Sequence, residues 1–456
     1  MVARWPADVE GPASDERPAD GTMSEAPRGS RGQGRRVTKA VIFLSGKDTE
    51  APDAGIQKRS GAAHQIGGYT TYVLAHARAA AALGFEPHIF SVASQSATFS
   101  TDYGVVHRVR SPFRPVRQSM VPFHLPILAR AVEDFGVRLR APVLIHGFVT
   151  WGAVSVAAAR RLNRRGVASK AITSFFSLYE HESQGKVLGA RVAAQGPRAR
   201  LRFGWELAWT KLAVNRSERV AYERSDLVAV NYESVRHLLT GAYGPRSTLR
   251  RIGYAPETAF LLDDRQPDKD RPEDAVPLIV CVSRHDPRKG VSVLIEALAI
   301  LRTRGIRVEA RLVGAGPLSD VHQRLIEARG LSDIVSLLGS VPDPMEHLAL
   351  ADIYVLPSLE EGSGSMSLLE AMQAGVAPVV SAIDGLPEDV EHDINGLLVP
   401  PADPEALAGA IGELVSDVPR RRRLGAAARQ TFERRFSSNV LVGALRDLYA
   451  EAGLAV

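Results

Sequence analysis

The sequence predicts an α/β fold in which two domains are each built on a parallel β-sheet, and three observations lead there. The chain has 456 residues, of which 45% are hydrophobic, enough for two domains with separate cores. Short apolar runs alternate with helix-like segments, as in parallel sheets covered by helices. A charged, proline-containing stretch without periodicity at 257–275 separates the two series, and we interpret it as the linker.

The first domain is predicted at 37–256. Residues 1–36 precede it, rich in Pro, Gly and charged residues and nearly without large apolar side chains, so we expect a disordered tail. Apolar runs bounded by polar or small residues predict its strands, at 39–44, 87–92, 141–145, 170–174 and 226–231.

Two adjacent glycines follow the first strand after a long loop. The loop at 45–66 is unusually long for a βα connection, and loops of that length are commonly functional. Gly67 and Gly68 then open a helix that runs to about Gly84. Because backbone N–H groups at a helix start attract phosphate, we predict that both glycines contact a ligand phosphate across a cleft between the domains.

The second domain is predicted at 276–435, and its most informative stretch is PSLEEGSGSMSLLEAMQAG at 357–375. An apolar strand ends at its first residue, a Gly/Ser loop follows, and a helix begins behind the loop. Such a helix start attracts phosphate, and the flanking carboxylates of Glu361 and Glu370 accept hydrogen bonds from hydroxyls. We predict a nucleotide-sugar diphosphate site, with an ordinary βα turn as the alternative. The further donor-binding residues are Gly362, Ser363, Gly364, Ser365, Met366, Ser367 and Leu368.

Two cations form a second group on the loop after the strand at 279–282. Arg284 offers a rigid fork and Lys289 a mobile point charge. Placed beside a departing diphosphate, they would stabilise the charge that develops on it. No DxD pair and no His/Cys cluster with metal-ligand spacing occurs nearby, so we predict no metal. Pairing with surface acids is the alternative interpretation.

The stretch LVGAGP at 312–317 imitates a dinucleotide fingerprint. Gly314 and Gly316 are present, but Ser319 occupies the place of the third glycine. A nicotinamide or flavin enzyme is therefore a minor alternative, and we assign both glycines to the donor site.

Five motifs in a fixed order carry a resemblance. They are VCVSRHDPRKGVSVLIEALAIL, LVGAGP, the 357–375 stretch, VAPVVSAIDGLPEDV and INGLLVPPADPEALAGAI. Together they resemble the donor half of family 4 retaining glycosyltransferases (glycosyl transferases group 1) with the GT-B fold. In one departure, eight residues separate Glu361 from Glu370, one more than in the family pattern.

The resemblance implies two Rossmann-like domains facing across a cleft, with a C-terminal helix at 436–456 crossing back to the first domain. It implies transfer of a sugar from a UDP- or GDP-linked donor to a small-molecule or lipid-linked acceptor, by a front-face mechanism without metal or other cofactor. Glu361 is expected to touch the sugar and Glu370 the ribose. A glycosyltransferase-like binding protein without activity is the alternative.

The acceptor side is less defined. Where the family often has a histidine facing the donor sugar, this chain has Phe175 and Phe176. His181 and His146 are the candidates to take that role. Two acids, Glu180 and Glu182, are candidates to bind an acceptor amine or hydroxyl.

Composition restricts the partners and the location. The net charge of +5 and the pI near 9.3 favour anionic ligands or an anionic membrane surface. The single cysteine, Cys281, lies in an apolar run and is predicted to be buried packing. No apolar run of membrane-spanning length and no signal-type segment occurs, so a cytoplasmic location is expected. The arginine run at 420–423 lacks aromatic neighbours, which argues for a solvated face and against a nucleic-acid partner.

One stretch raises the question of a membrane. Residues 186–224 carry nine Lys or Arg against three Glu, with Trp205 and Trp209 among them. Apolar residues at helical spacing give this stretch a core-facing side, and we expect both tryptophans to join it. The prediction is therefore a soluble acceptor, with weak peripheral membrane contact and a lipid acceptor as the alternative.

Overall fold

A computed structural model describes residues 39–45, 68–113, 118–192, 196–261 and 275–453. The predicted tail, Gly67 and most of the predicted long loop and linker lie outside these residues. The described chain belongs to one compact unit, Thr38–Val456, which contains two separate sheets.

The first sheet has eight strands in the order β3-β4-β2-β1-β5-β6-β7-β8, and β3 is its one antiparallel strand within the described residues. Its central strands are buried on both faces, as near-continuous apolar runs predict for parallel strands. The bounds are β1 Ala40–Leu44, β2 Glu86–Ala93, β3 Ala97–Thr101, β4 Gly104–Arg110, β5 Val143–Phe148, β6 Ser169–Phe175, β7 Leu227–Val230 and β8 Leu249–Arg251.

Helices cover both faces of this sheet. Apolar side chains of α2 and α3 pack on the face that holds Ile42 and Leu44, and those of α1 pack on the face that holds Val41 and Phe43. The helices are α1 Gly68–Ala82, α2 Val121–Leu139, α3 Gly152–Arg164, α4 Tyr179–Val192, α5 Pro197–Trp209, α6 Asn215–Arg224, α7 Glu233–Tyr243 and α8 Thr258–Leu261.

The second sheet has six parallel strands in the order β11-β10-β9-β12-β13-β14. On β9, Ile279 and the buried Cys281 pack with α9 and α14, whereas Val280 packs on the opposite face with α12. The bounds are β9 Leu278–Val282, β10 Glu309–Val313, β11 Val335–Gly339, β12 Ile353–Leu356, β13 Ala377–Ser381, β14 Leu397–Val399, α9 Val291–Thr303, α10 Ser319–Ala328, α11 Met345–Ala349, α12 Met366–Gln373, α13 Leu386–Asp389 and α14 Pro404–Ser416.

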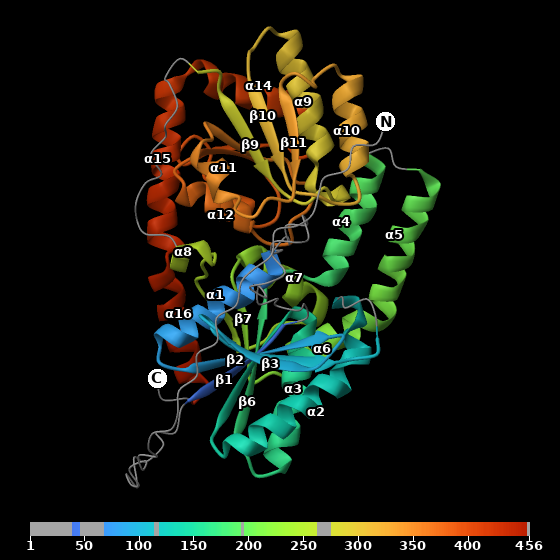
Figure 1. Ribbon diagram of the computed structural model, residues 1–456, viewed down its shortest axis with the longest axis vertical. Helices are drawn as coiled ribbons and strands as arrows, with labels where there is room; N and C mark the ends of the chain where they lie inside the picture. The colour runs from blue at the N-terminus through green and yellow to red at the C-terminus, as the bar shows by residue number, and fades with distance from the viewer. Residues whose placement is uncertain (1–38, 46–67, 114–117, 193–195, 262–274, 454–456) are drawn as a thin grey trace, which may run out of the picture. The chain divides into compact units, whose positions relative to one another are not determined.

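The last two helices connect the sheets. Helix α15 (Val418–Arg435) packs against α12 and β13 of the second sheet, and α16 (Ser438–Glu451) lies beside α1 of the first, as Figure 1 shows. Tyr449 on α16 bonds to His146 of β5 at 3.1 Å. The predicted two-sheet α/β fold with a returning C-terminal helix is confirmed, while the predicted domain limits stay predictions.

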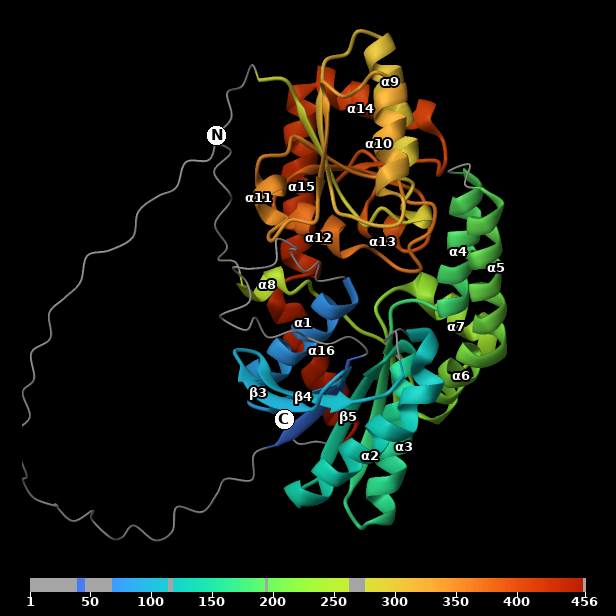
Figure 2. The same ribbon diagram turned by 45° about the vertical axis from the view of Figure 1, so that its right-hand side comes forward.

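Helix α4 makes a second connection. In Figures 1 and 2, α4 and α5 run side by side as a pair. The α4 backbone lies directly against the short helical turn Pro287–Lys289 of the second sheet, where a Cβ atom on Gly189 would collide with the Pro287 carbonyl. This close approach brings side chains of α4 next to the loops of the second sheet.

Candidate functional site

A cavity of about 970 Å³ lies between the carboxyl ends of the strands of the second sheet and the α1 and α4 side of the first. In parallel α/β sheets, ligands bind at this end of the strands. From the first half of the chain it is lined by Tyr72, Trp151, Phe176, Asn231 and Tyr254, among others, and from the second half by Arg284, Lys289, Gly314, Glu361, Ser363, Gly364, Ser365, Met366, Ser367 and Glu370, among others.

The 357–375 stretch forms one wall. Helix α12 starts at Met366, so the N–H groups of its first turn have no partner within the helix and are available to a ligand. A Cβ atom on Gly364 would collide with the Tyr232 hydroxyl, which explains the glycine there. Gly362 is turned toward Ser177, and the Leu368 side chain is fully buried, so neither lines the cavity.

Glu361 and Lys289 form a closed pair in this wall. The Lys289 ammonium donates to both carboxylate oxygens of Glu361 at 2.5 and 2.6 Å. The Ser358 hydroxyl donates to the same carboxylate at 2.5 Å. Burial lowers the pKa of Lys289, and the Glu361 carboxylate opposes that effect. The pair therefore holds the loop in place with its charges already balanced.

Arg284 and Glu370 behave in the opposite way. Arg284 is exposed to the cavity, and neither residue has a hydrogen bond or ion pair with any described residue. Burial, together with the carboxylates of Asp343 and Glu257, raises the pKa of Glu370 to about 8. Arg284 and Glu370 thus face the same cavity, which the first residues of α12 also line, without a partner among the described residues.

Of the predicted donor-site glycines outside the Gly/Ser loop, only some of the described ones line the cavity. Gly314, with φ of 129°, directly follows β10 and lines the cavity. Gly316 packs against the backbone of His285, where a Cβ atom would meet the carbonyl oxygen at 2.5 Å, and does not line it. Gly68 is the first residue of α1, and the cavity is lined by Thr71 and Tyr72 one turn later.

His146 does not reach the cavity. The sequence predicted His146 at the end of a strand. Strand β5 instead continues to Phe148, so His146 lies inside the sheet. It is fully buried and bonds to the Ser174 hydroxyl at 2.7 Å. Burial lowers its pKa well below the usual value. It is therefore a neutral structural histidine here, and we withdraw it from the candidate sugar contacts.

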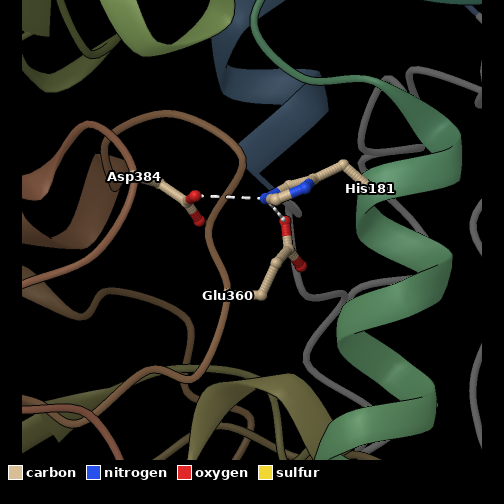
Figure 3. Close-up of side chains that lie close together, drawn as sticks. All are labelled: His181, Glu360 and Asp384. Atoms are coloured by element: carbon tan, nitrogen blue, oxygen red, sulfur yellow. Dashed lines mark hydrogen bonds and ion pairs between the residues drawn. The ribbon is translucent and has the colours of Figure 1, made fainter. Parts of the chain in front are cut away.

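His181 also lies away from the cavity, on α4. Its Nε2 is 3.1 Å from an oxygen of Asp384 and 3.9 Å from an oxygen of Glu360. Dashed lines mark both contacts in Figure 3. These residues line a separate cavity of about 350 Å³. Phe176, one of the two phenylalanines that stand where the family often has a histidine, lines the large cavity.

Several polar residues of the cavity were missed or only partly predicted. Arg288 bonds to Glu360 at 3.0 Å and lies 3.4 Å from Glu182, which joins the two halves of the chain. Glu182 lines the cavity, whereas the Glu180 carboxylate is bound to Asn215 at 2.6 Å and does not line it. The Asn231 Oδ1 atom is buried at the cavity and accepts no hydrogen bond from a described residue. Asn231 ends a predicted strand, and this position was the signal available in the sequence.

The surface of α5 differs from the prediction. On α5, Trp205 is 71% exposed and Leu201 is 64% exposed, and Leu212, just after the helix, is also 64% exposed. The prediction that Trp205 packs in the core is therefore wrong. Trp209 is half-buried and donates to the Ser119 carbonyl at 3.0 Å. Lys186, counted with the basic surface, instead lines the cavity and pairs with Glu206 at 2.7 Å.

Two other surface features concern partners. In the predicted solvated arginine run, Arg420 pairs with Asp393 at 2.8 Å and with Glu413 at 2.9 Å. Among the helices of the described ranges, none is long and apolar enough to cross a membrane.

Family models and known proteins match both halves of the chain. Residues 263–431 match the model "Glycosyl transferases group 1", and residues 67–255 match "Glycosyl transferase 4-like domain". A GDP-mannose-dependent alpha-(1-6)-phosphatidylinositol monomannoside mannosyltransferase of Mycobacterium tuberculosis is 30% identical over 301 residues, 59% of this chain and 76% of the relative. A putative colanic acid biosynthesis glycosyltransferase of Escherichia coli is 40% identical over 143 residues, 29% of this chain and 35% of the relative.

Solved structures show the same fold. Sucrose-phosphate synthase from Thermosynechococcus elongatus superposes with a TM-score of 0.68 at 22% identity, covering 91% of this chain and 99% of that one. Anabaena HepE in complex with UDP-glucose gives 0.61 at 16% identity, covering 90% and 99%. The two sheets have the GT-B arrangement, and the chain belongs to the family 4 glycosyltransferases, the glycosyl transferases group 1.

Proposed function

We propose that this glycosyltransferase transfers a sugar from a nucleoside diphosphate donor to a hydroxyl acceptor with retention of anomeric configuration. The observation that carries the proposal is that Arg284 and Glu370, neither paired with a described residue, line one cavity together with Met366, where α12 begins. A diphosphate needs a cation and N–H donors, and a ribose diol needs a carboxylate acceptor.

The proposed roles follow from these positions. Arg284 and the first N–H groups of α12 bind the diphosphate, and Glu370 accepts hydrogen bonds from the ribose. The Glu361 and Lys289 pair faces the transferred sugar and keeps the loop in place. As the bond from the sugar to the phosphate oxygen breaks, negative charge grows on the diphosphate, and fixed positive groups stabilise it. In this proposal the protein supplies that charge without a metal.

The acceptor step is proposed to occur on one face of the sugar. The acceptor oxygen forms its bond to the anomeric carbon on the side that the diphosphate leaves, and the departing phosphate oxygen takes the hydroxyl proton. No side chain needs to act as base. This agrees with the burial of His146 against Ser174 and with the position of His181 outside the donor cavity.

For the donor, GDP-mannose is the first compound to test. The relative from Mycobacterium tuberculosis is named as GDP-mannose-dependent, whereas HepE, at lower identity, was crystallised with UDP-glucose. We therefore place this chain with a GDP- or UDP-linked sugar. The cytoplasmic location expected from the sequence is part of the same proposal.

For the acceptor, the face of α5 supports a lipid-linked molecule rather than the soluble one predicted from the sequence. On α5, exposed Leu201 and Trp205 lie close in sequence to exposed Arg198 and Arg200, and exposed Leu212 follows α5. This combination binds anionic lipid surfaces. We expect co-sedimentation with anionic vesicles at near-physiological salt. Trp205→Ser should weaken it without lowering the melting temperature, because this side chain is largely in solvent. If the wild type does not sediment with the vesicles, or if Trp205→Ser sediments equally, the soluble acceptor predicted from the sequence is favoured.

The test of the function is donor turnover. The chain is incubated with a panel of UDP- and GDP-sugars, release of nucleoside diphosphate is measured, and the anomeric configuration of the product is read by nuclear magnetic resonance. We expect one donor to be consumed, with retention. Inverted product would contradict the mechanism. Nucleotide binding without turnover on any donor would favour the inactive binding protein.

A further inference from the structure

Outside the donor cavity, three side chains with metal-ligating atoms converge at one point. His181 comes from α4, Glu360 from the loop after β12, and Asp384 from the segment before α13 (Figure 3). One ligand atom of each lies within 4.8 Å of the others. His181 and Asp384 are 203 residues apart in the sequence, so spacing could not reveal the group, and the sequence predicted no metal ligands.

Each carboxylate is anchored by one oxygen and leaves the other toward His181. The Oε2 atom of Glu360 accepts from Arg288 at 3.0 Å. The Oδ2 atom of Asp384 accepts from the backbone N–H groups of Glu361 and Gly362 at 2.7 and 2.9 Å. Carboxylates that ligate metals are typically oriented by such outer hydrogen bonds.

The inward oxygen of Glu360 is the second, independent sign of a ligand. Glu360 is only 4% exposed, and its Oε1 accepts no hydrogen bond from any residue that the structure describes. Buried polar atoms are normally satisfied, because an unpaired one loses its hydration without compensation. This oxygen instead points toward Nε2 of His181, 3.9 Å away.

The backbone is shaped to bring the group together. Gly185 lies one helical turn after His181, and a Cβ atom there would meet Glu360 at 2.6 Å. Asp384 adopts φ of 47°, in the left-handed region that non-glycine residues seldom occupy. Such local strain is found where a side chain must be held in a required direction.

We propose that His181, Glu360 and Asp384 bind a zinc ion. Bonds of about 2.1 Å to a tetrahedral ion place neighbouring ligand atoms about 3.4 Å apart, and the observed separations from Nε2, 3.1 and 3.9 Å, lie on either side of that value. An imidazole with carboxylates suits Zn²⁺, whereas Mg²⁺ and Ca²⁺ prefer oxygen ligands alone. The adjoining cavity of about 350 Å³ leaves room for a water as fourth ligand.

The zinc acts as a clamp rather than as a catalyst. None of its three ligands lines the donor cavity, so this ion takes no part in the transfer chemistry proposed above. The ion joins α4 to the loop after β12. Through Asp384 it also fixes the backbone of Glu361 and Gly362. Zinc binding therefore stabilises the packing of the first half of the chain against the donor loop.

The test uses the purified full chain, freed of metal with EDTA, and no sugar donor. Added Zn²⁺ should raise the melting temperature progressively, because a ligand of the folded state alone stabilises it, while Mg²⁺ should not. Calorimetry should show zinc affinity weakened at least about tenfold in His181→Ala and in Asp384→Asn. His237→Ala is the matched control, since that side chain is 76% exposed and outside the group.

A third variant separates a metal ligand from an ordinary hydrogen bond. His181→Gln keeps an N–H donor for Asp384 but loses the imidazole, so it should follow His181→Ala. No zinc response in the wild-type chain would overturn the proposal, and so would equal zinc affinity in the wild type and His181→Gln. Because no donor is present, these outcomes do not depend on whether the proposed transfer occurs.

Discussion

The two carboxylates that flank the Gly/Ser loop, Glu361 and Glu370, have the same chemistry but different surroundings. Glu361 is held by Lys289 and Ser358. Glu370 has no partner among the described residues, and its pKa is raised to about 8. A carboxylate with its charge balanced supports the loop, whereas one left unpaired in a cavity stands ready for a ligand.

The two cations show the same division. Lys289 donates to Glu361, while Arg284 lines the cavity without a hydrogen bond or ion pair to any described residue. Before a ligand binds, Lys289 and Glu361 are therefore already paired, whereas Arg284 and Glu370 have no partner among the described residues. We expect a diphosphate to complete the Arg284 side and a ribose to complete the Glu370 side.

The largest effect should come from Arg284. Arg284→Ala should lower turnover by about two to three powers of ten, the usual loss when one group that stabilises transition-state charge is removed. The melting temperature of this variant should stay unchanged, because the Arg284 side chain has no hydrogen bond or ion pair with the described part of the chain. Steady-state kinetics with Arg164→Ala, a change at an exposed arginine on α3, as the control would check this. Near-normal turnover would remove Arg284 from the diphosphate site.

The next effect concerns stability rather than turnover alone. Lys289→Ala leaves the buried Glu361 carboxylate without its cation, and breaking a buried pair in this way costs about 3–5 kcal/mol. The side chains of the pair are only 11% and 4% exposed. Denaturant unfolding should show the loss, and Lys289→Met with Glu361→Gln should recover part of it. A lone Lys289→Ala variant as stable as the wild type would contradict the supporting role.

A smaller effect is expected for the unpaired carboxylate. Glu370→Gln should weaken binding of the free nucleoside diphosphate by about 1.5–3 kcal/mol, the contribution of hydrogen bonds to a charged group. Glu361→Gln should leave that affinity nearly unchanged. Calorimetry of both variants decides between them, and the reverse order would exchange the two roles.

The smallest effect is the pH dependence of that binding. Below about pH 8 the free protein holds a proton on Glu370, and ribose hydroxyls favour the ionised form. Binding should therefore release this proton, and affinity should rise between pH 7 and about 8 and then level off. The effect should be absent in Glu370→Gln. A flat profile in the wild type would mean that the ribose lies elsewhere.

The raised pKa of Glu370 also makes the stability of the free protein depend on pH. A carboxyl whose pKa rises from 4.5 to about 8 on folding binds more protons folded than unfolded in this range. Its contribution to stability is then lost as the pH rises from about 4.5 to 8. In denaturant unfolding, the loss of stability between about pH 4.5 and 8 should be smaller in Glu370→Gln than in the wild type.

The donor wall could be predicted because its residues follow one another along the chain. Ser363 to Ser367 and Glu370 lie on one loop and the helix that follows it, directly after β12, so local patterns place them together. The edge strand β3 was missed because its residues are mostly exposed and lack an apolar run. His146 was misplaced since an apolar run fixes the middle of a strand better than its end.

The remaining contacts depend on how distant segments pack. Nothing in the order of residues says that Lys289 reaches Glu361, or that α4 lies against the turn Pro287–Lys289. The exposure of Trp205 has the same cause, because helical spacing shows which residues share a face but not whether another element covers it.

The most direct test of the proposed donor site is a crystal structure of the chain with a bound nucleoside diphosphate. We predict diphosphate oxygens within about 3 Å of the Arg284 guanidinium and of the first N–H groups of α12, with the ribose hydroxyls on Glu370. Lys289 should stay paired with Glu361. A diphosphate bound away from Arg284, or a ribose that does not touch Glu370, would contradict the division between balanced and unpaired groups.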